Sequence, residues 1–508
     1  MYQIILKKMT IFCYYNVRPN SSNRLEQLTD TSNIFFLEGH LFTSEPLPFV
    51  KSFIEEINQV IKKYDQNLRL TRIQKSWLAF CIMAIFLTRT VCWAKYERAS
   101  LGKRSMAAIS WMFRRSNIPW EKLLIFSTTA IMQRFGITCG SLAIDETDKK
   151  RSKSSKKIYK LHKIKDKASG GYVMGQKLVF LVLIAKNITI PVGFQFYMPD
   201  PQLKDWQKQD EKLRKQGVAK KDRPVKPDRD DNYPQIPEIA LNLLREFKAN
   251  HSQIKVHCIT ADALYGTQSF MDEASEIFGG VQVISQIKEN QNVLFRNRKI
   301  PVKKYFTSHP GVKQQVRIRG GEKMTVTVGS ARLHVCAHDK KRFVIALKYE
   351  GEEDYRYIVA TDLSWRTLDI VEAYSLRWLI EVVFEDWKAN EGWNRLTKHV
   401  GEDGSRRGVI LSLLSDHCLF FHPDQQAFID DNLPACTVGS LTRQIRVESL
   451  LQFIIDLVND ENPHQKLDTL TETLKKEIYN LSPSSKHMSG RCLGRLEPTP
   501  ALKYKNAA

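Results

Sequence analysis

The sequence contains no apolar run long enough to span a membrane. Its longest apolar stretch, residues 77–87, has 11 residues, whereas a bilayer-spanning helix needs about 20. We therefore expect a buried helix there and no membrane association. The first 20 residues also lack a secretory cleavage pattern, because polar residues interrupt their short apolar tract: Tyr14, Tyr15, Asn16 and Arg18.

Cysteine and histidine are present but form no disulfide or metal-binding pattern. The nine cysteines are scattered, and the closest pair is Cys81 and Cys92, so neither a zinc knuckle nor a disulfide framework is expected. The 12 histidines show no ligand spacing either. This usage favours a reducing, cytoplasmic location.

Negative charge is in deficit. Lys and Arg number 77 against 55 Asp and Glu, which gives a net charge of +22. Such a surplus usually means a polyanionic partner, and nucleic acid is the first candidate. The 43% of apolar residues can fill the cores of about three packed units, at about 100–200 residues per unit.

The N-terminal part is helical in pattern. Residues 49–136 carry apolar side chains at helical spacing. Asn117 and Pro119 separate two such patterns, residues 105–115 and 120–135. The pair is short enough for a helix-turn-helix, and the alternative is two packed helices that enter no DNA groove.

The middle of the chain alternates between strand and helix patterns, which indicates an α/β core. Expected strands are 140–145, 177–185, 188–197, 254–261 and 281–287, with helices at 237–250 and 267–278. Residues 199–234 have little to bury and predict an exposed excursion without regular structure. A basic loop, 149–167, holds ten Lys or Arg and one Asp; it either is solvated or grips phosphates through Lys149, Lys150 and Arg151.

Only strand patterns occur at residues 290–362, which predicts an inserted β subdomain. One long helix is expected at 367–388. Further helices are expected at 406–421, 441–458 and 467–479, before a frayed tail of 28 residues.

Two acidic residues follow apolar strands directly. Asp145 comes after Leu142-Ala143-Ile144, and Asp262 comes after Ile259-Thr260-Ala261. Open α/β sheets bind ligands at the carboxyl edge of their strands, and two carboxylates there repel each other unless a cation lies between them. The alternative is that each Asp caps a turn or a helix.

The expected helix at 367–388 presents one polar face. At about 100° per residue, four side chains share an arc of about 60°: Tyr374, Arg377, Glu381 and Lys388. A solvated face with an Arg377–Glu381 pair is the alternative. Helical periodicity also cannot choose the carboxylate, because Glu385 lies on the same face.

Three motifs in this order resemble those of the DDE transposases of the bacterial insertion-sequence-four family. They are Ala143-Ile144-Asp145-Glu146-Thr147, then Thr260-Ala261-Asp262-Ala263-Leu264-Tyr265-Gly266, then Tyr374, Arg377, Glu381 and Lys388 at spacings of three, four and seven residues. The resemblance implies a ribonuclease-H-like mixed sheet core interrupted by a β-rich insertion, with helical N- and C-terminal regions. It also implies catalytic, metal-binding roles for Asp145, Asp262 and Glu381, and contacts to transposon-end DNA for Tyr374, Arg377 and Lys388.

The domain organisation expected from this resemblance has five parts. They are a helical DNA-binding region at 1–136, the first part of the catalytic core at 137–290, the insertion at 291–364, the second part of the core at 365–425, and a helical C-terminal region with a tail at 426–508.

The function implied is Mg²⁺-dependent DNA transposition. Three carboxylates can hold two Mg²⁺ ions, with Mn²⁺ as a substitute, for cleavage and strand transfer at phosphodiester bonds. The expected partners are double-stranded DNA, as transposon ends and target, and a second copy in a homodimeric synaptic complex in the bacterial cytoplasm at the nucleoid. The alternatives are a metal-dependent structure-specific nuclease without strand transfer and a decayed or domesticated DNA-binding protein.

Overall fold

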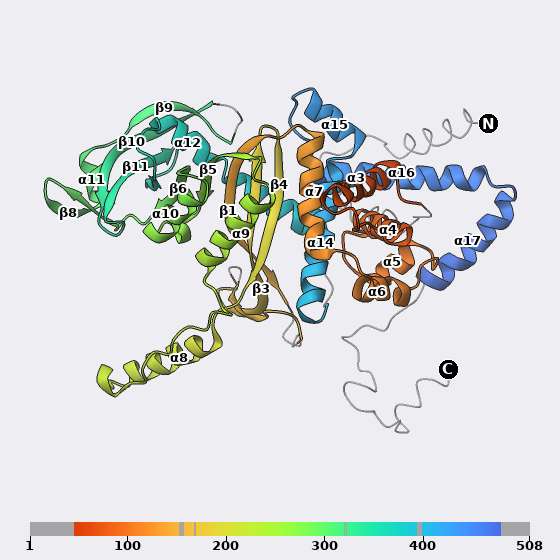
Figure 1. Cartoon of the computed structure of the whole chain (residues 1–508), viewed down its shortest axis with the longest axis horizontal. Coiled ribbons are helices and arrows are strands. Elements are labelled where there is room, and N and C mark those ends of the chain that lie inside the picture. The colour runs from red at the N-terminus through yellow and green to blue at the C-terminus, as the bar shows by residue number, and fades with distance from the viewer. Residues whose placement is uncertain are drawn as a thin grey trace, which may run out of the picture.

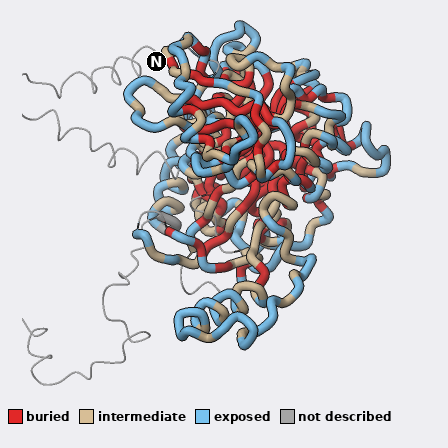
Figure 2. The backbone as a smooth tube through the Cα atoms, turned by 90° about the vertical axis from the view of Figure 1, so that its left-hand side faces the viewer, coloured by how far each residue is buried: buried red, intermediate tan, exposed pale blue. Residues whose placement is uncertain are grey.

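The computed structural model describes residues 45–151, 157–166, 169–319, 321, 323–393 and 399–478. A mixed sheet of 12 strands forms one side of the molecule, and helices from both ends of the chain form the other (Figure 1). Buried residues are concentrated in the interior of the molecule, and exposed residues lie mainly around its outline (Figure 2). The expected mixed α/β class with helical terminal regions is confirmed.

The described part of the N-terminal region, from residue 45 on, contains the expected helices. They are α3 (Pro48–Tyr64), α4 (Arg72–Thr88), α5 (Trp93–Ala99), α6 (Met106–Arg115) and α7 (Trp120–Arg134). A capping box between Thr71 and Gln74 starts α4, whose apolar run is buried as predicted. Among the described residues no single helix is long and apolar enough to cross a membrane, although α4 and α5 pass that test as a bent pair.

The α6–α7 pair does not present a free second helix. α7 contacts α3, α14 and β4, and its buried residues include Leu123, Ile131 and Met132. A recognition helix must offer one face to a DNA groove. The structure therefore favours the alternative of two packed helices.

The sheet of the expected core contains both antiparallel and parallel strand pairs. β3 (Tyr172–Ala185) pairs antiparallel with β1 (Cys139–Lys150), β2 (His162–Lys165) and β4 (Ile188–Tyr197), while β5 (Lys255–Ala261) pairs parallel with β1 and with β6 (Gln282–Ile287). α9 (Ile236–Asn250) packs on β3 and β4, and α10 (Gln268–Ile277) packs on β6.

β1 is longer than the sequence pattern predicted. It does not end at Asp145, because the ladder with β3 continues from Asp145↔Phe180 to Lys150↔Gly175. Lys149 and Lys150 therefore belong to a strand and not to a loop, and β2 forms a further part of the segment interpreted as a basic loop.

The polar excursion at 199–234 is exposed as expected, but it is not irregular. It contains α8 (Pro201–Lys215), which has no buried residue, and a short 3₁₀ helix, η1 (Lys220–Asp222). Asp200 caps α8 by accepting hydrogen bonds from Gln202 N and Leu203 N, and Pro201 occupies its first turn. Local capping thus starts a helix that projects from the body of the protein (Figure 1).

The β-rich insertion continues the core sheet. Its elements are β7 (Asn292–Phe295), β8 (Arg298–Pro301), α11 (Val302–Ser308), β9 (Val312–Arg317), β10 (Lys323–Val335), β11 (Lys340–Tyr349) and β12 (Arg356–Ala360). β12 pairs antiparallel with β6, from Tyr357↔Ile287 to Ala360↔Ile284. The expectation of strands alone was wrong, because α11 packs against β7 and β8.

The helix expected at 367–388 is broken in two. α12 (Thr367–Ser375) and α13 (Trp378–Asn390) are separated by Leu376 and Arg377. The break is a tight turn whose amides bond three residues back, as in Arg377 N to Tyr374 O and Ile380 N to Arg377 O, both at 3.1 Å. The register of about 100° per residue therefore does not run through the signature.

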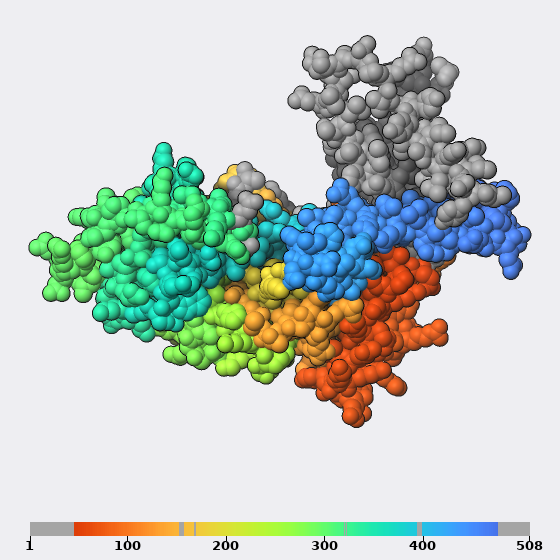
Figure 3. All heavy atoms as spheres, turned by 90° about the horizontal axis from the view of Figure 1, so that it is seen from above, coloured from red at the N-terminus to blue at the C-terminus, as the bar shows by residue number. Residues whose placement is uncertain are grey.

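The C-terminal region contains α14 (Gly401–Leu419), α15 (Pro423–Asp430), α16 (Val438–Val458) and α17 (Pro463–Ile478). Three of these were expected with shifted ends, and α15 was not. The tail expected after residue 480 lies outside the described residues. The insertion and the N-terminal helices lie at opposite ends of the molecule (Figure 3).

Phe180→Ala should destabilise the core where it meets α13. The Phe180 ring is fully buried, and its centroid lies 5.4 Å from that of Phe384 and 5.0 Å from that of Trp387. We expect a loss of about 3–5 kcal/mol in the free energy of unfolding, measured by urea denaturation. Tyr172→Ala on the same strand, where the side chain is 71% exposed, should have little effect; equal losses in both variants would contradict the prediction.

Candidate active site

The parallel ladder between β1 and β5 brings Asp145 and Asp262 to the same edge of the sheet. The last paired residues of this ladder are Ile144 and Ala261, and each Asp is the next residue in its chain segment. Asp262 is close enough for its charge to raise the pKa of Asp145. The fold thus brings together two residues that the sequence placed at strand ends.

Asp262 also caps a short helix. Its Oδ1 accepts a hydrogen bond of 2.8 Å from Leu264 N at the start of η2 (Ala263–Tyr265). Ser285 Oγ donates to the Asp262 backbone oxygen at 2.6 Å. The capping alternative therefore applies to this residue, and these bonds fix its position beside β6.

Arg377 joins the other two acids of the predicted triad. Its Nη1 donates to Asp145 Oδ2 at 2.7 Å, and its Nη2 donates to Glu381 Oε1 at 2.9 Å. The side chains of Arg377 and Asp145 are only 14% and 15% exposed. The i,i+4 pair is therefore real, but it is one half of a bridge to the sheet. Glu385 is exposed to solvent, so this contact favours Glu381 as the third carboxylate.

The three carboxylates repel one another. The pKa of Asp145 is raised to about 6, because burial and, to a smaller extent, the charges of Asp262 and Glu381 outweigh the lowering by Arg377. A hard divalent cation suits this set of oxygen donors and would relieve their repulsion. Within the described residues, however, the three acids do not form a group whose ligand atoms all lie within 4.8 Å of one another.

Sequence reasoning assigned no role to three residues beside Asp145. Tyr265 donates its hydroxyl proton to Glu146 Oε2 at 3.2 Å, and Lys177 Nζ lies 3.9 Å from Glu146 Oε1. Burial raises the pKa of Glu146 to about 7, although Lys177 lowers it. The sequence feature that could have pointed to these residues is the pair of adjacent acids, Asp145-Glu146, on one buried strand.

The Tyr374 side chain is buried in the protein. It is 8% exposed, and burial raises the pKa of its hydroxyl to about 12. Its ring centroid lies 6.0 Å from the Arg377 guanidinium carbon. Tyr374 thus packs beside Arg377, and its contact to transposon-end DNA stays a prediction.

Two residues of α13, one at its start and one in its last turn, lie nearer the surface. Trp378, within the signature, is 38% exposed, and the Arg319 guanidinium carbon lies 4.1 Å from its ring centroid. Lys388 is half-buried, with Nζ 5.7 Å from the Phe384 ring.

Three consecutive basic residues lie at the end of β1 and directly after it, and only the middle one is well exposed. Lys150 is 59% exposed and pairs with Asp166 at 2.5 Å. Lys149 lies against the Trp393 ring at 5.7 Å, and burial lowers its pKa to about 7. Arg151 Nη2 donates to Gln176 Oε1 at 2.9 Å, and burial lowers its pKa to about 10. Residues 152–156 and 167–168 of the predicted basic loop lie outside the described residues.

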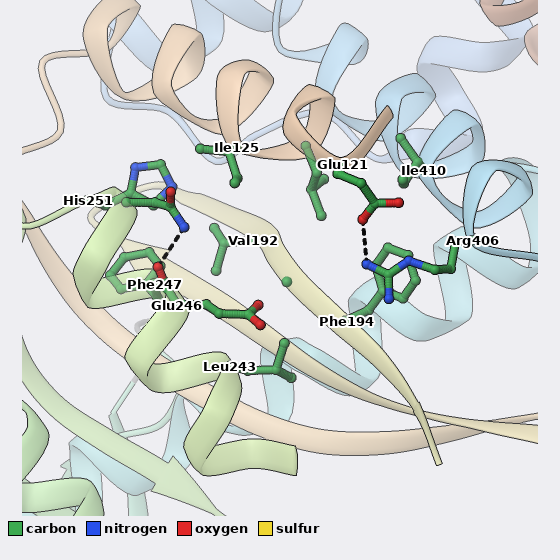
Figure 4. A pocket seen from close by; sticks show the side chains of 13 residues that line it. Glu121, Ile125, Val192, Phe194, Leu243, Glu246, Phe247, His251, Arg406 and Ile410 are labelled. Atoms are coloured by element: carbon green, nitrogen blue, oxygen red, sulfur yellow. Dashed lines mark hydrogen bonds and ion pairs between the residues drawn. The ribbon is translucent and has the colours of Figure 1, made fainter. Parts of the chain in front are cut away.

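A small cavity of about 80 Å³ lies away from these acids, between α7, α9, β4 and α14 (Figure 4). It contains an ion pair of 2.7 Å between Arg406 and Glu121. None of the triad residues line it.

The part of the chain that holds Asp145 and Asp262 is similar to a known family. Residues 98–336 match a family model described as DDE superfamily endonuclease. This part of the chain is therefore similar to a DDE-type endonuclease domain; it includes Asp145 and Asp262 and ends before Glu381. The match names the superfamily and not the insertion-sequence-four family, which stays a prediction. No curated protein matches the chain.

Two solved structures are similar at low identity. A piggyBac transposase synaptic complex with hairpin DNA has 11% identity and a TM-score of 0.41, covering 94% of this chain and 91% of that chain. The NurA nuclease from Sulfolobus solfataricus has 10% identity and a TM-score of 0.22, covering 51% of this chain and 81% of that chain. At these values neither similarity bears on the chemistry of the site.

Glu146→Gln should change how stability depends on pH. Between pH 4.5, the ordinary pKa of the group, and about 7, the folded protein keeps a proton that the unfolded chain has released. Stability therefore falls as pH rises through this range. The variant should lose up to about 1.4 kcal/mol per pH unit of this slope, measured by urea denaturation at a series of pH values. Glu385→Gln is the control; an unchanged slope in Glu146→Gln would disprove the assignment.

Proposed function

We propose that the protein is a DNA transposase that binds the inverted ends of its own insertion sequence and catalyses Mg²⁺-dependent strand cleavage and strand transfer. The observation that carries the proposal is the Arg377 bridge between Asp145 and Glu381, beside Asp262. It links the DDE-type endonuclease domain to a carboxylate 119 residues after Asp262.

Asp145, Asp262 and Glu381 are the residues proposed to hold the metal. The chemistry that bound Mg²⁺, or Mn²⁺ in its place, supplies is activation of a water or 3′-hydroxyl and stabilisation of the leaving oxygen. Because Arg377 holds oxygens of Asp145 and Glu381, a cation on those oxygens competes with it. We expect Arg377 then to turn to a DNA phosphate, which its planar guanidinium binds well.

Surface charge supports DNA as the substrate. The chain carries a net charge of +22, and phosphate contacts by Lys and Arg dominate the affinity of proteins for DNA. Lys150 and Lys388 are the residues of the predicted set whose positions suit direct phosphate contacts. Lys149, Arg151 and Tyr374 are proposed to support them from the interior.

A homodimer in the synaptic complex is also proposed. On α16 a row of apolar side chains faces solvent at spacings of four, three and four residues: Val447, Leu451, Ile454 and Val458, which are 39–55% exposed. This spacing is typical of a helix that packs along another helix. We also propose a location at the bacterial nucleoid, on the basis of the resemblance to the DDE transposases of the insertion-sequence-four family.

A structure-specific DNA nuclease is the second candidate, since the matched family is described as an endonuclease. Both candidates cleave DNA at the same carboxylates, and only a transposase joins the 3′ ends to new DNA. The test is to incubate the full chain with the DNA that flanks its gene, Mg²⁺ and a supercoiled plasmid. Sequenced junctions between flanking ends and plasmid support the transposase, whereas cleavage without junctions supports the nuclease.

Glu381→Gln should abolish cleavage without abolishing DNA binding. The substitution keeps the shape of the side chain and removes the charge that holds a cation, so we expect the cleavage rate to fall by at least about 10³-fold, on the scale of lost electrostatic stabilisation at an active site. Cleavage of the same flanking DNA and its retention in gel-shift assays provide the two measurements.

Glu385→Gln is the matched control, because Glu385 lies one turn further along α13 and is exposed. It should cleave at the wild-type rate. Loss of cleavage in Glu385→Gln with full activity in Glu381→Gln would transfer the role to Glu385.

A further inference from the structure

A group of metal-ligating side chains lies in the C-terminal helices, outside the candidate active site. One ligand atom from each of His422, Asp424 and Glu448 lies within 4.8 Å of the other two. His422 and Asp424 stand at the start of α15, and Glu448 projects from the middle of α16. Among the described residues this is the one group of three that meets this distance.

His422 is the buried member of this group. It is 1% exposed, and neither ring nitrogen has a hydrogen-bond partner. Nδ1 lies 3.9 Å from Asp424 Oδ2, and Nε2 lies 3.8 Å from Glu448 Oε2. These distances are too long for hydrogen bonds. Buried polar atoms are almost always satisfied, so the ring nitrogens point to a missing partner.

Gln444 occupies the space between the two carboxylates. Its Nε2 donates to Asp424 Oδ2 and, at 3.0 Å, to Glu448 Oε1. The side-chain amide thus places a positive dipole end where a cation would be attracted. Turning the amide over would present Oε1, an oxygen ligand, to the same point.

We propose that His422, Asp424 and Glu448 form a binding site for one divalent zinc-class ion, with Gln444 as a further oxygen ligand. An imidazole with two carboxylates is a donor set that Zn²⁺ uses, at bonds of about 2.0–2.2 Å. Small inward movements of the carboxylates, which are 53% and 40% exposed, close the site. Ligation through Nδ1, on the side of Asp424, leaves Nε2 facing Glu448 Oε2. Glu448 then ligates through Oε1, and its Oε2 supports the histidine ring.

The site would join two helices, because its ligands come from the start of α15 and from α16. His422 stands between α14 and α15, and its ring packs against Phe49 of α3 at 5.0 Å. A bound ion would tie this corner to α16. Because magnesium prefers oxygen ligands, the imidazole distinguishes this site from the all-carboxylate active site.

The test is zinc binding by the full chain, after treatment with a chelator, in excess Mg²⁺. We expect one Zn²⁺ per chain in the wild type by calorimetry and elemental analysis, and a rise in melting temperature. Asp424→Asn with Glu448→Gln should weaken binding at least about tenfold and remove the rise. Co²⁺ in place of Zn²⁺ should give visible absorption bands that the double variant lacks.

Two controls keep the outcome decisive. Asp430→Asn with Glu461→Gln makes the same charge change at exposed positions and should bind zinc as the wild type does. Asp145→Asn should also retain binding. Zinc binding that is absent from the wild type, unchanged in Asp424→Asn with Glu448→Gln, or lost in Asp145→Asn overturns the proposal.

Discussion

Repulsion between like charges is the constraint around which the candidate site is arranged. The β1–β5 ladder fixes Asp145 and Asp262 at one sheet edge, and α13 adds Glu381. Since the carboxylates lie in a partly buried setting, each raises the free energy of the others' charged forms. Arg377 offsets part of this repulsion, because its guanidinium bonds to two of the carboxylates, Asp145 and Glu381. The positions of α12 and α13 follow, because the turn between them aims Arg377 at the sheet.

The helix that carries Glu381 is held from the opposite side. Trp387 Nε1 donates to Ser412 Oγ of α14 at 2.9 Å, and the Trp387 ring stacks on Trp393 at 4.4 Å. Phe180 of β3 packs against the same tryptophan. α13 thus packs between the core sheet and the C-terminal helices. The packing of Trp387 therefore fixes the position of the helix that carries Glu381.

The sequence revealed those parts of the fold that depend on local pattern. Continuous apolar runs predicted β3–β6, and strand ends predicted Asp145 and Asp262. It could not reveal the turn at Leu376 and Arg377, because both residues are good helix formers and tertiary contacts decide the break. The bond from Arg377 to Asp145 joins residues 232 positions apart, and no local pattern reports such a contact.

The local sequence pattern also did not indicate which polar side chains are buried. Tyr374 and Lys149 belong to polar sets by type, yet both are buried, because the β1–β3 ladder runs on to Lys150 and α12 packs on β5 and β6. The histidine spacing likewise gave no hint of His422, whose neighbours come from two helices brought together by the fold.

The sheet does not stop at the boundary of the insertion. β12 is bonded to β6 along four residue pairs, and the Ser285 hydroxyl of β6 holds the backbone of Asp262. A mechanical path of hydrogen bonds therefore runs from the outer strands to the second carboxylate. A force applied to the outer strands, by DNA or by another protein, would be transmitted through these hydrogen bonds to the backbone of Asp262. The insertion is thus mechanically coupled to the candidate site.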